Sequence, residues 1–147
     1  KKSSNQSVEK SVHLERLYEL DSRIFDKSVL EFFSKESFNR VNKFNNFIKS
    51  LKTKKLKIYA YGAAAKGISF LNFCGDQAKL IQGVFDKNQM KQGRYIPRLN
   101  IEILDPLDIR KIQPDYIIIL PWNLKNEIEE ELSFISDWGG KLISFEY

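Results

Sequence analysis

Two side chains that build many active sites are nearly missing from the 147-residue sequence, which contains one cysteine and one histidine. A single thiol, Cys74, excludes a disulfide within the chain and a zinc site built from several cysteines. Because Cys74 falls near the end of a predicted helix, we interpret it as a packing residue. The lone imidazole, His13, lies in a polar stretch and is expected on a helix surface. No catalytic residue and no metal ligand is therefore predicted.

Long apolar runs are lacking as well. No run reaches the length of a membrane-spanning helix, and no signal-peptide pattern is present. The expectation is a cytoplasmic protein that contacts no membrane. The chain starts with lysine instead of methionine, which suggests a fragment of a longer protein.

The charge balance is mildly basic, with 24 basic and 19 acidic side chains and a formal net charge of +5. This suits an anionic ligand. The lysines are scattered and paired with acids, so nucleic acid is not an expected partner. The densest basic run, residues 52–57, is interpreted as a solvated helix end.

The first third of the chain is helical in pattern. Apolar residues recur at three- and four-residue steps from about residue 8 to 51, which predicts two or three helices. Three serines are expected to cap or break them: Ser28, Ser34 and Ser37. An apolar cluster between these serines is expected to pack on the sheet in preference to a missing domain: Val29, Leu30, Phe32 and Phe33. Residues 1–52 are therefore assigned to a helical extension that links to a preceding domain.

The pattern changes in residues 53–147, where short apolar runs alternate with helical stretches. Strands are expected at residues 56–61, 80–85, 101–104, 115–120 and 141–145. Helices are expected at 63–74, 106–112 and 123–138, with Asp105 and Asn123 as amino-terminal caps. Such alternation predicts an α/β fold, a small Rossmann-like, doubly wound domain with a mainly parallel sheet.

The turn after the first strand has the spacing of a dinucleotide-binding fingerprint from Gly62 to Gly67. Gly62 suits the tight turn, and Gly67 suits close packing of the helix on the sheet. Ala64 stands where the middle glycine belongs, next to Ala63, and Lys66 adds a positive charge. Asp86 ends the second strand roughly 20 residues on, where a ribose-binding acid is expected.

Ligands of open α/β sheets bind at the carboxyl ends of the strands, and polar or aromatic groups follow three predicted ends. One tryptophan, Trp122, is placed to stack on a base or a sugar. The candidate contacts outside the glycine turn are Asp86, Lys87, Lys91, Arg94, Tyr95, Pro121, Trp122 and Asn123. The chain also lacks the glycine-rich acidic strand end that binds S-adenosylmethionine, and no paired acids flank a pocket. These features indicate a binder of an anion without catalytic groups.

Several blocks in fixed order resemble the C-terminal domain of the S-adenosylmethionine-dependent sugar C-methyltransferases. They are Tyr61-Gly62-Ala63-Ala64-Ala65-Lys66-Gly67, Val84-Phe85-Asp86-Lys87-Asn88, Lys91-Gln92-Gly93-Arg94-Tyr95-Ile96-Pro97, Pro114-Asp115-Tyr116, Leu120-Pro121-Trp122-Asn123-Leu124, Glu127-Ile128 and Trp138-Gly139-Gly140-Lys141. The match runs from about Leu56 to the end of the chain.

This resemblance implies a multidomain enzyme in which a zinc-binding domain and a methyltransferase domain precede this one. The implied role of the present chain is to help hold a nucleotide-linked, dTDP-type deoxysugar. S-adenosylmethionine and zinc are implied for the missing domains, and the preceding methyltransferase domain is the implied partner.

Two other functions stay open at this point. The spacing from Gly62 to Gly67 together with Asp86 also fits an NAD(P)-type dinucleotide-binding module of an oxidoreductase or regulator. The aromatic residues of the helical extension also fit an interaction or scaffold domain.

Overall fold

The computed structural model describes residues 10–51 and 55–145, and the chain divides into two compact units, Lys1–Phe38 and Asn39–Tyr147. Helix α1 (Lys10–Asp21) and the first part of α2 (Lys27–Leu51) belong to the first unit. The rest of α2 belongs to the second unit, with the sheet. Within the described residues, two helices therefore precede the first strand, as the periodicity predicts. Residues 52–54 of the basic run lie outside the described residues.

Helix α2 differs from expectation at its serines. The serines do not break it, and the hydroxyl of Ser37 instead donates to the carbonyl of Phe33 at 2.8 Å within the helix. The neighbouring apolar cluster belongs to the first unit, and its packing on the sheet or on a missing domain stays a prediction. Its members are 38, 54, 66 and 58% exposed, in the order Val29, Leu30, Phe32 and Phe33.

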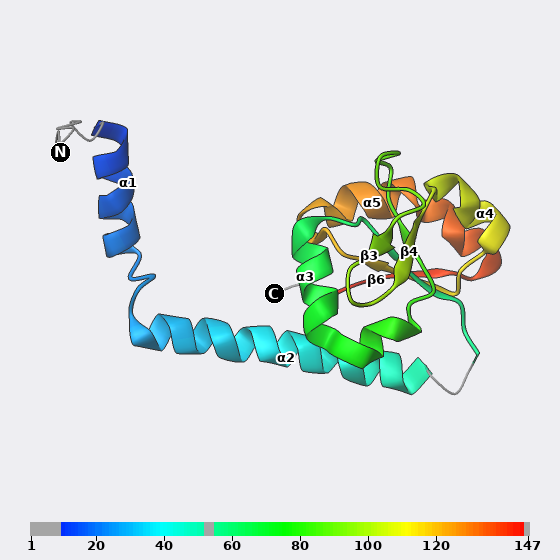
Figure 1. Ribbon diagram of the computed structural model, residues 1–147, viewed down its shortest axis with the longest axis horizontal. Helices are drawn as coiled ribbons and strands as arrows, with labels where there is room; N and C mark the ends of the chain where they lie inside the picture. The colour runs from blue at the N-terminus through cyan, green and yellow to red at the C-terminus, as the bar shows by residue number, and fades with distance from the viewer. Residues whose placement is uncertain (1–9, 52–54, 146–147) are drawn as a thin grey trace. The chain divides into compact units, whose positions relative to one another are not determined.

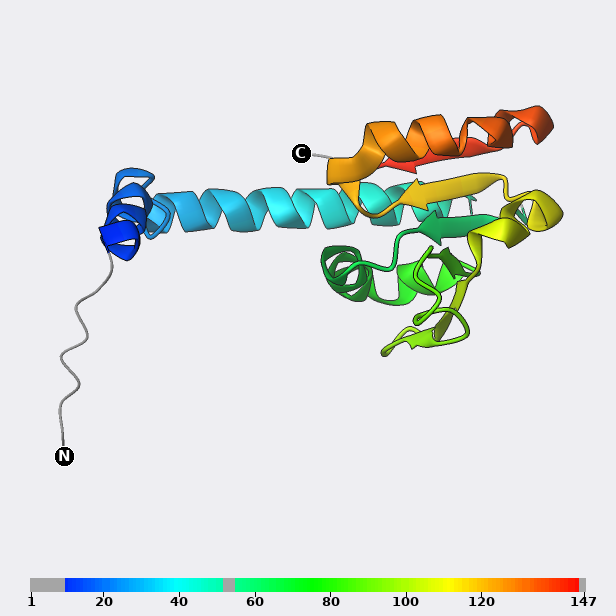
Figure 2. The ribbon, with the colours of Figure 1, turned by 90° about the horizontal axis from the view of Figure 1, so that it is seen from above.

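Six strands form one sheet in the order β3-β4-β2-β1-β5-β6, and every neighbouring pair is parallel except β3 and β4 (Figure 2). The strands are β1 (Ile58–Tyr61), β2 (Val84–Phe85), β3 (Tyr95–Ile96), β4 (Ile101–Leu104), β5 (Tyr116–Ile119) and β6 (Lys141–Ser144). The predicted α/β fold with a mainly parallel sheet is confirmed. Strand β2 is shorter than predicted: Leu80 ends the 3₁₀ helix η2 (Gly75–Leu80), and residues 81–83 precede the strand without belonging to it. Strand β3 was not predicted.

Helical segments cover both faces of the sheet (Figure 1). On one face, α3 (Ala65–Cys74), η2 and the second part of α2 pack on alternate strand residues such as Ala60 and Ile118. On the other, α4 (Ile109–Ile112), α5 (Lys125–Glu131) and η5 (Ser133–Trp138) pack on Tyr61, Ile117 and Ile119. Strand residues point alternately to the two faces, which explains why the strands are apolar on both sides.

Three local predictions about helix ends have different outcomes. Asp105 caps η3 (Pro106–Asp108), because its carboxylate accepts from the N–H of Leu107 at 2.9 Å. Asn123 does not cap a helix: it lies within η4 (Trp122–Leu124), and α5 begins after Leu124 without a side-chain cap. The single helix predicted for residues 123–138 is therefore three shorter segments.

The two scarce side chains, Cys74 and His13, lie where the sequence predicts them. Cys74 is 4% exposed in the core, and burial raises the pKa of its thiol to about 12. A thiol with this pKa stays protonated at neutral pH, which agrees with a packing role. His13 is exposed on α1. Among the described residues, no helix combines the length and apolar character needed to cross a membrane.

Candidate functional site

The candidate site lies at the point where the order of the strands reverses direction: β2 and β4 lie on one side of β1, and β5 and β6 lie on the other. Strand β1 pairs with β2 on one side and with β5 on the other, so its carboxyl end is the switch point at which open α/β sheets bind ligands. Two segments meet there: the turn from β1 to α3, and the segment that leaves β5 through Pro121.

Both glycines of the predicted turn are required by packing. Gly62 has φ +87°, and a Cβ at this position would lie 2.6 Å from Cδ of Pro121. A Cβ on Gly67 would lie 2.6 Å from Cβ of Leu120. The tight turn at Gly62 and the close packing at Gly67 are therefore confirmed. The room that these glycines provide is filled by the chain leaving β5.

Helix α3 begins at this turn and presents its amino-terminal end to a cavity of about 270 Å³. The first N–H groups of an α-helix have no intrahelical acceptor, and Ala64, which precedes this helix, offers no side chain to cap them. Lys66 lies in this first turn and is exposed. No acid lines the cavity, whose described lining is Ala64, Ala65, Lys66, Gly67, Leu120, Pro121, Trp122 and Asn123. Free N–H groups and a lysine favour an anion here.

Asp86 is only 8% exposed, and both its carboxylate oxygens are engaged by the chain itself. One oxygen accepts from the N–H of Ala63 at 2.7 Å and from Nζ of Lys91 at 3.0 Å, and the other accepts from the N–H of Asn88 at 2.8 Å. Nζ of Lys91 also donates to the carbonyl of Ala63 at 3.0 Å. Asp86 and Lys91 thus brace the β1–α3 turn.

This bracing disfavours a dinucleotide site. A ribose-binding acid needs a carboxylate oxygen for the ribose hydroxyl, and a pyrophosphate at the turn needs the backbone N–H groups. Here Asp86 uses its oxygens on the turn, and the N–H of Ala63 is occupied. The same occupied amide, with no glycine-rich acidic strand end, does not fit S-adenosylmethionine.

A second cavity of about 270 Å³ adjoins the first at Ala64 and Pro121. The hydroxyl of Tyr61 donates to Oε1 of Glu131 at 3.0 Å, and Nζ of Lys87 lies 2.6 Å from Oε2 of Glu131. Burial, followed by this hydrogen bond, raises the pKa of Tyr61 far above its ordinary value, so the phenol stays protonated. The cavity also borders Glu127, so that three acids and one lysine line it beside apolar side chains such as Leu124 and Ile128.

Glu131, Glu127 and Tyr61 were not among the predicted contacts. Glu127 and Glu131 occur in an acid-rich helical stretch that resembles any solvated helix face. Only the strand register, which turns Tyr61 toward α5, brings the three side chains together.

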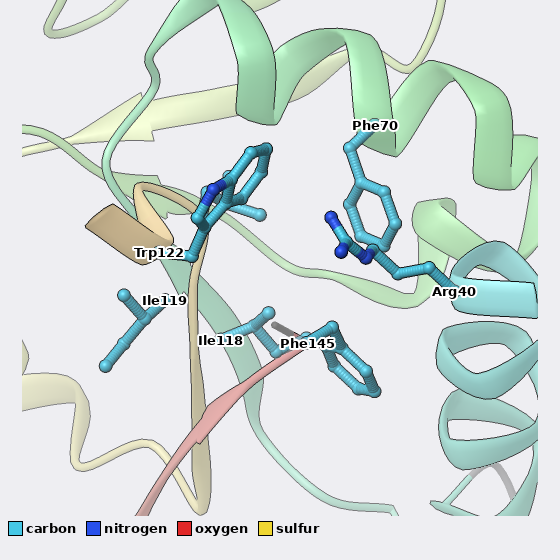
Figure 3. Close-up of a pocket in the computed structure, with 7 residues that line it drawn as sticks. Arg40, Phe70, Ile118, Ile119, Trp122 and Phe145 are labelled. Atoms are coloured by element: carbon cyan, nitrogen blue, oxygen red, sulfur yellow. The ribbon is translucent and has the colours of Figure 1, made fainter. Parts of the chain in front are cut away.

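Trp122 lies at the start of η4, and an arginine from a distant part of the chain packs on its ring. Cζ of Arg40, from α2, lies 5.5 Å from the ring centroid of Trp122. Figure 3 shows the Arg40 side chain reaching past Phe70 toward the indole. Asn123 follows Trp122 and lines the first cavity instead of capping a helix.

Arg94 and Tyr95 are not gathered at this site. Tyr95 pairs with Glu102 in the antiparallel β3–β4 ladder, at the sheet edge farthest from β6, and 54% of its surface is exposed. Neither residue lines the two cavities beside Ala64. The structure thus brings together the predicted contacts from Gly62 to Gly67, from Asp86 to Lys91 and from Pro121 to Asn123.

Comparison with known proteins gives two findings. A family model described as the C-methyltransferase C-terminal domain matches residues 1–145. The C-methyltransferase NovU of Streptomyces niveus is 34% identical over 87 residues, which make up 58% of this chain and 20% of that protein. The matched part is thus a fifth of this curated relative.

Proposed function

Because the chain belongs to the C-methyltransferase C-terminal domain family, we propose that it is the substrate-binding domain of an S-adenosylmethionine-dependent methyltransferase. The proposed substrate is a nucleotide-linked, dTDP-type deoxysugar, bound in the cytoplasm. The methyl donor and a zinc ion belong, in this proposal, to domains that precede the chain. The chain holds no catalytic centre and contributes one wall of the substrate site.

The observation that carries the proposal is the contrast between the two adjoining cavities. The cavity at α3 is lined by Lys66 and no acid, and it receives the helix N–H groups. The cavity at α5 is lined by Glu127 and Glu131 with one lysine, Lys87, and by Asp86, whose oxygens are used on the β1–α3 turn. A diphosphate suits the first because both the helix end and the lysine are positive. A neutral, hydroxyl-bearing sugar suits the second because carboxylate oxygens accept hydrogen bonds from hydroxyl groups.

Calorimetric titration of the chain with dTDP and with a dTDP-deoxysugar tests the proposal. We expect Lys66→Met to weaken the binding of both ligands about tenfold, a loss of ~1.4 kcal/mol. Lys141→Met is the matched control. Lys141 is an exposed lysine at the amino-terminal ends of the strands, whereas the site lies at their carboxyl ends. The absence of binding heat, together with unshifted N–H signals of Ala65 to Gly67 in NMR spectra, would overturn it.

A second variant tests where the sugar binds. Glu131→Gln keeps the size of the side chain and removes its charge. We expect it to weaken dTDP-deoxysugar binding about threefold and to leave dTDP binding unchanged, since dTDP has no sugar beyond its diphosphate. Equal effects on both ligands would contradict a sugar position beside α5.

We also propose that the first unit contacts the preceding methyltransferase domain. Helix α1 buries none of its side chains, and a 12-residue helix without tertiary packing is marginal in water. Large apolar side chains in this unit are more than half exposed: Tyr18, Leu20, Phe25, Leu30, Phe32, Phe33 and Phe38. Light scattering separates a contact with a preceding domain from self-association. A stable dimer of the chain alone would favour a scaffold that associates with itself.

A further inference from the structure

One residue on the buried stripe of α2 departs from the pattern of the others. The buried side chains of this helix are Arg40, Phe44, Ile48 and Leu51, at steps of four, four and three residues. Such a stripe faces the core of an amphipathic helix, and its other three members are apolar. Phe44 packs edge-on against Phe70 and Phe145, with ring centroids 5.3 and 5.2 Å apart. Arg40 continues this aromatic packing by one turn toward the candidate site.

Burying an arginine is costly unless its charge meets suitable partners. Arg40 is 8% exposed, and its guanidinium lies over the indole of Trp122 at 5.5 Å from the ring centroid. A planar guanidinium stacks on an aromatic face, which an apolar side chain or a lysine does less well. The fourth stripe position therefore has the side-chain type that suits a tryptophan ring.

The spaces on the two sides of Trp122 differ in size. Together with Arg40, Phe70 and Phe145, it encloses a cavity of about 10 Å³, barely enough for one water molecule (Figure 3). Trp122 also lines the cavity of about 270 Å³ at the amino-terminal end of α3. Trp122 lines a third cavity of about 220 Å³ as well, over η4 and the start of α5, and Arg40 lines neither of the two large cavities. The α2 side of the ring thus has only a water-sized space, and the ligand-sized spaces lie away from Arg40.

We infer that Arg40 is a positioning residue, which holds the indole of Trp122 in place as a wall of the ligand cavity. The inference rests on the proposed function, because it takes Trp122 to contact the base or the sugar of the ligand. Arg40 itself does not line that cavity. Its effect on affinity comes from fixing the ring before the ligand arrives, which lowers the ordering cost of binding.

Fluorine NMR of the chain labelled with 5-fluorotryptophan tests this directly, because each of the two tryptophans gives one signal. Trp122→Phe assigns the signals. We expect Arg40→Met, which keeps an unbranched side chain but loses the guanidinium, to shift or broaden the Trp122 signal and leave the Trp138 signal unchanged. dTDP binding should weaken about fivefold. Arg40→Lys should restore the charge but not the ring position, with intermediate affinity.

The matched control is a second arginine that packs on an aromatic ring away from the site. Cζ of Arg110 lies 4.1 Å from the ring centroid of Phe134, and its side chain is 64% exposed. Arg110→Met should leave the Trp122 signal and the dTDP affinity unchanged. If Arg40→Met does not fold, Arg40→Lys decides by the same two measurements.

The outcomes are distinguishable from those of the proposed function. A wild-type chain that fails to bind dTDP overturns the proposed function, while the fluorine signals still report whether Arg40 fixes the ring. Normal dTDP binding combined with an unchanged Trp122 signal in both Arg40 variants overturns the positioning role. A purely structural role would lower the melting temperature and leave the affinity of the folded protein unchanged, which also overturns it.

Discussion

The two tryptophans of the chain lie near opposite edges of the sheet, and their polar atoms are used differently. Trp138 ends η5, and its indole N–H donates to the carbonyl of Pro114 at 3.0 Å. Its ring packs near Phe134, at 5.9 Å between centroids, on the face covered by α5. Trp122 follows β5 at the carboxyl edge, and among the described residues no hydrogen bond from its indole N–H is found.

This difference separates a ring that completes a fold from a ring available to a ligand. Buried polar groups are nearly always paired, so a tryptophan whose N–H is satisfied by the backbone has a structural explanation. Trp122 is held by Arg40 on one side and borders a ligand-sized cavity on the other. We therefore expect different responses to substitution: loss of stability around Trp138 and loss of ligand affinity at Trp122.

The largest effect is expected beside Trp138. A Cβ on Gly140 would lie 2.8 Å from the carbonyl oxygen of Pro114, 2.9 Å from that of Ile135 and 2.9 Å from Nε1 of Trp138. Gly140→Ala therefore forces backbone atoms apart, and we expect a loss of about 2–3 kcal/mol in the free energy of unfolding, measured with urea. The dTDP affinity of the folded protein should not change.

Gly139→Ala is the control for this variant. Gly139 has φ +82°, but a Cβ there meets nothing within 4 Å, so only the left-handed backbone is unfavourable. Its expected cost is about 1 kcal/mol. Equal losses of unfolding free energy in the two variants would mean that the backbone around Trp138 accommodates the added Cβ at little cost. Trp138 would then not be a residue on which the stability of the fold depends.

A smaller effect, on a different property, is expected at Trp122. Trp122→Ala should weaken dTDP-deoxysugar binding about tenfold, in the range known for an aromatic side chain that stacks on a base. The loss of stability should be smaller than in Gly140→Ala, because part of the ring is already exposed. Unchanged affinity, with stability reduced as far as in Gly140→Ala, would place Trp122 with Trp138 as a structural residue.

Sequence patterns predicted the sheet and its edge well, because these depend on local periodicity. Tyr116 to Ile119 is apolar on both faces, and only a strand buried on both sides explains this run. The two-residue strand β3 is too short to have a period. The prediction of one helix for residues 123–138 was wrong because periodicity does not show where a helix is interrupted. Ile128, Leu132 and Ile135 are spaced as in one helix, although α5 and η5 are distinct segments.

The side-chain partners at the site could not be predicted, because they join residues far apart in the chain. Asp86 at a strand end suits a ribose, but the fold brings Ala63 and Lys91 to both sides of its carboxylate. Arg40 on an otherwise apolar helical stripe is visible in the sequence. That it meets Trp122 depends on how α2 packs in the second unit. Periodicity therefore locates the edge of the sheet, whereas tertiary contacts decide which groups remain for a ligand.

The smallest effect is expected for Trp138→Phe, which removes the N–H bonded to Pro114 and keeps an aromatic ring. The expected loss is about 1 kcal/mol in the free energy of unfolding, the usual net value of one hydrogen bond. This variant leaves Trp122 as the sole tryptophan, so its fluorescence reports on the ligand cavity alone. If dTDP quenches this emission with wild-type affinity, the two rings are independent. A loss of quenching would show that the Trp138 corner supports the ligand site across the sheet, and the division of roles between the two tryptophans would then be wrong.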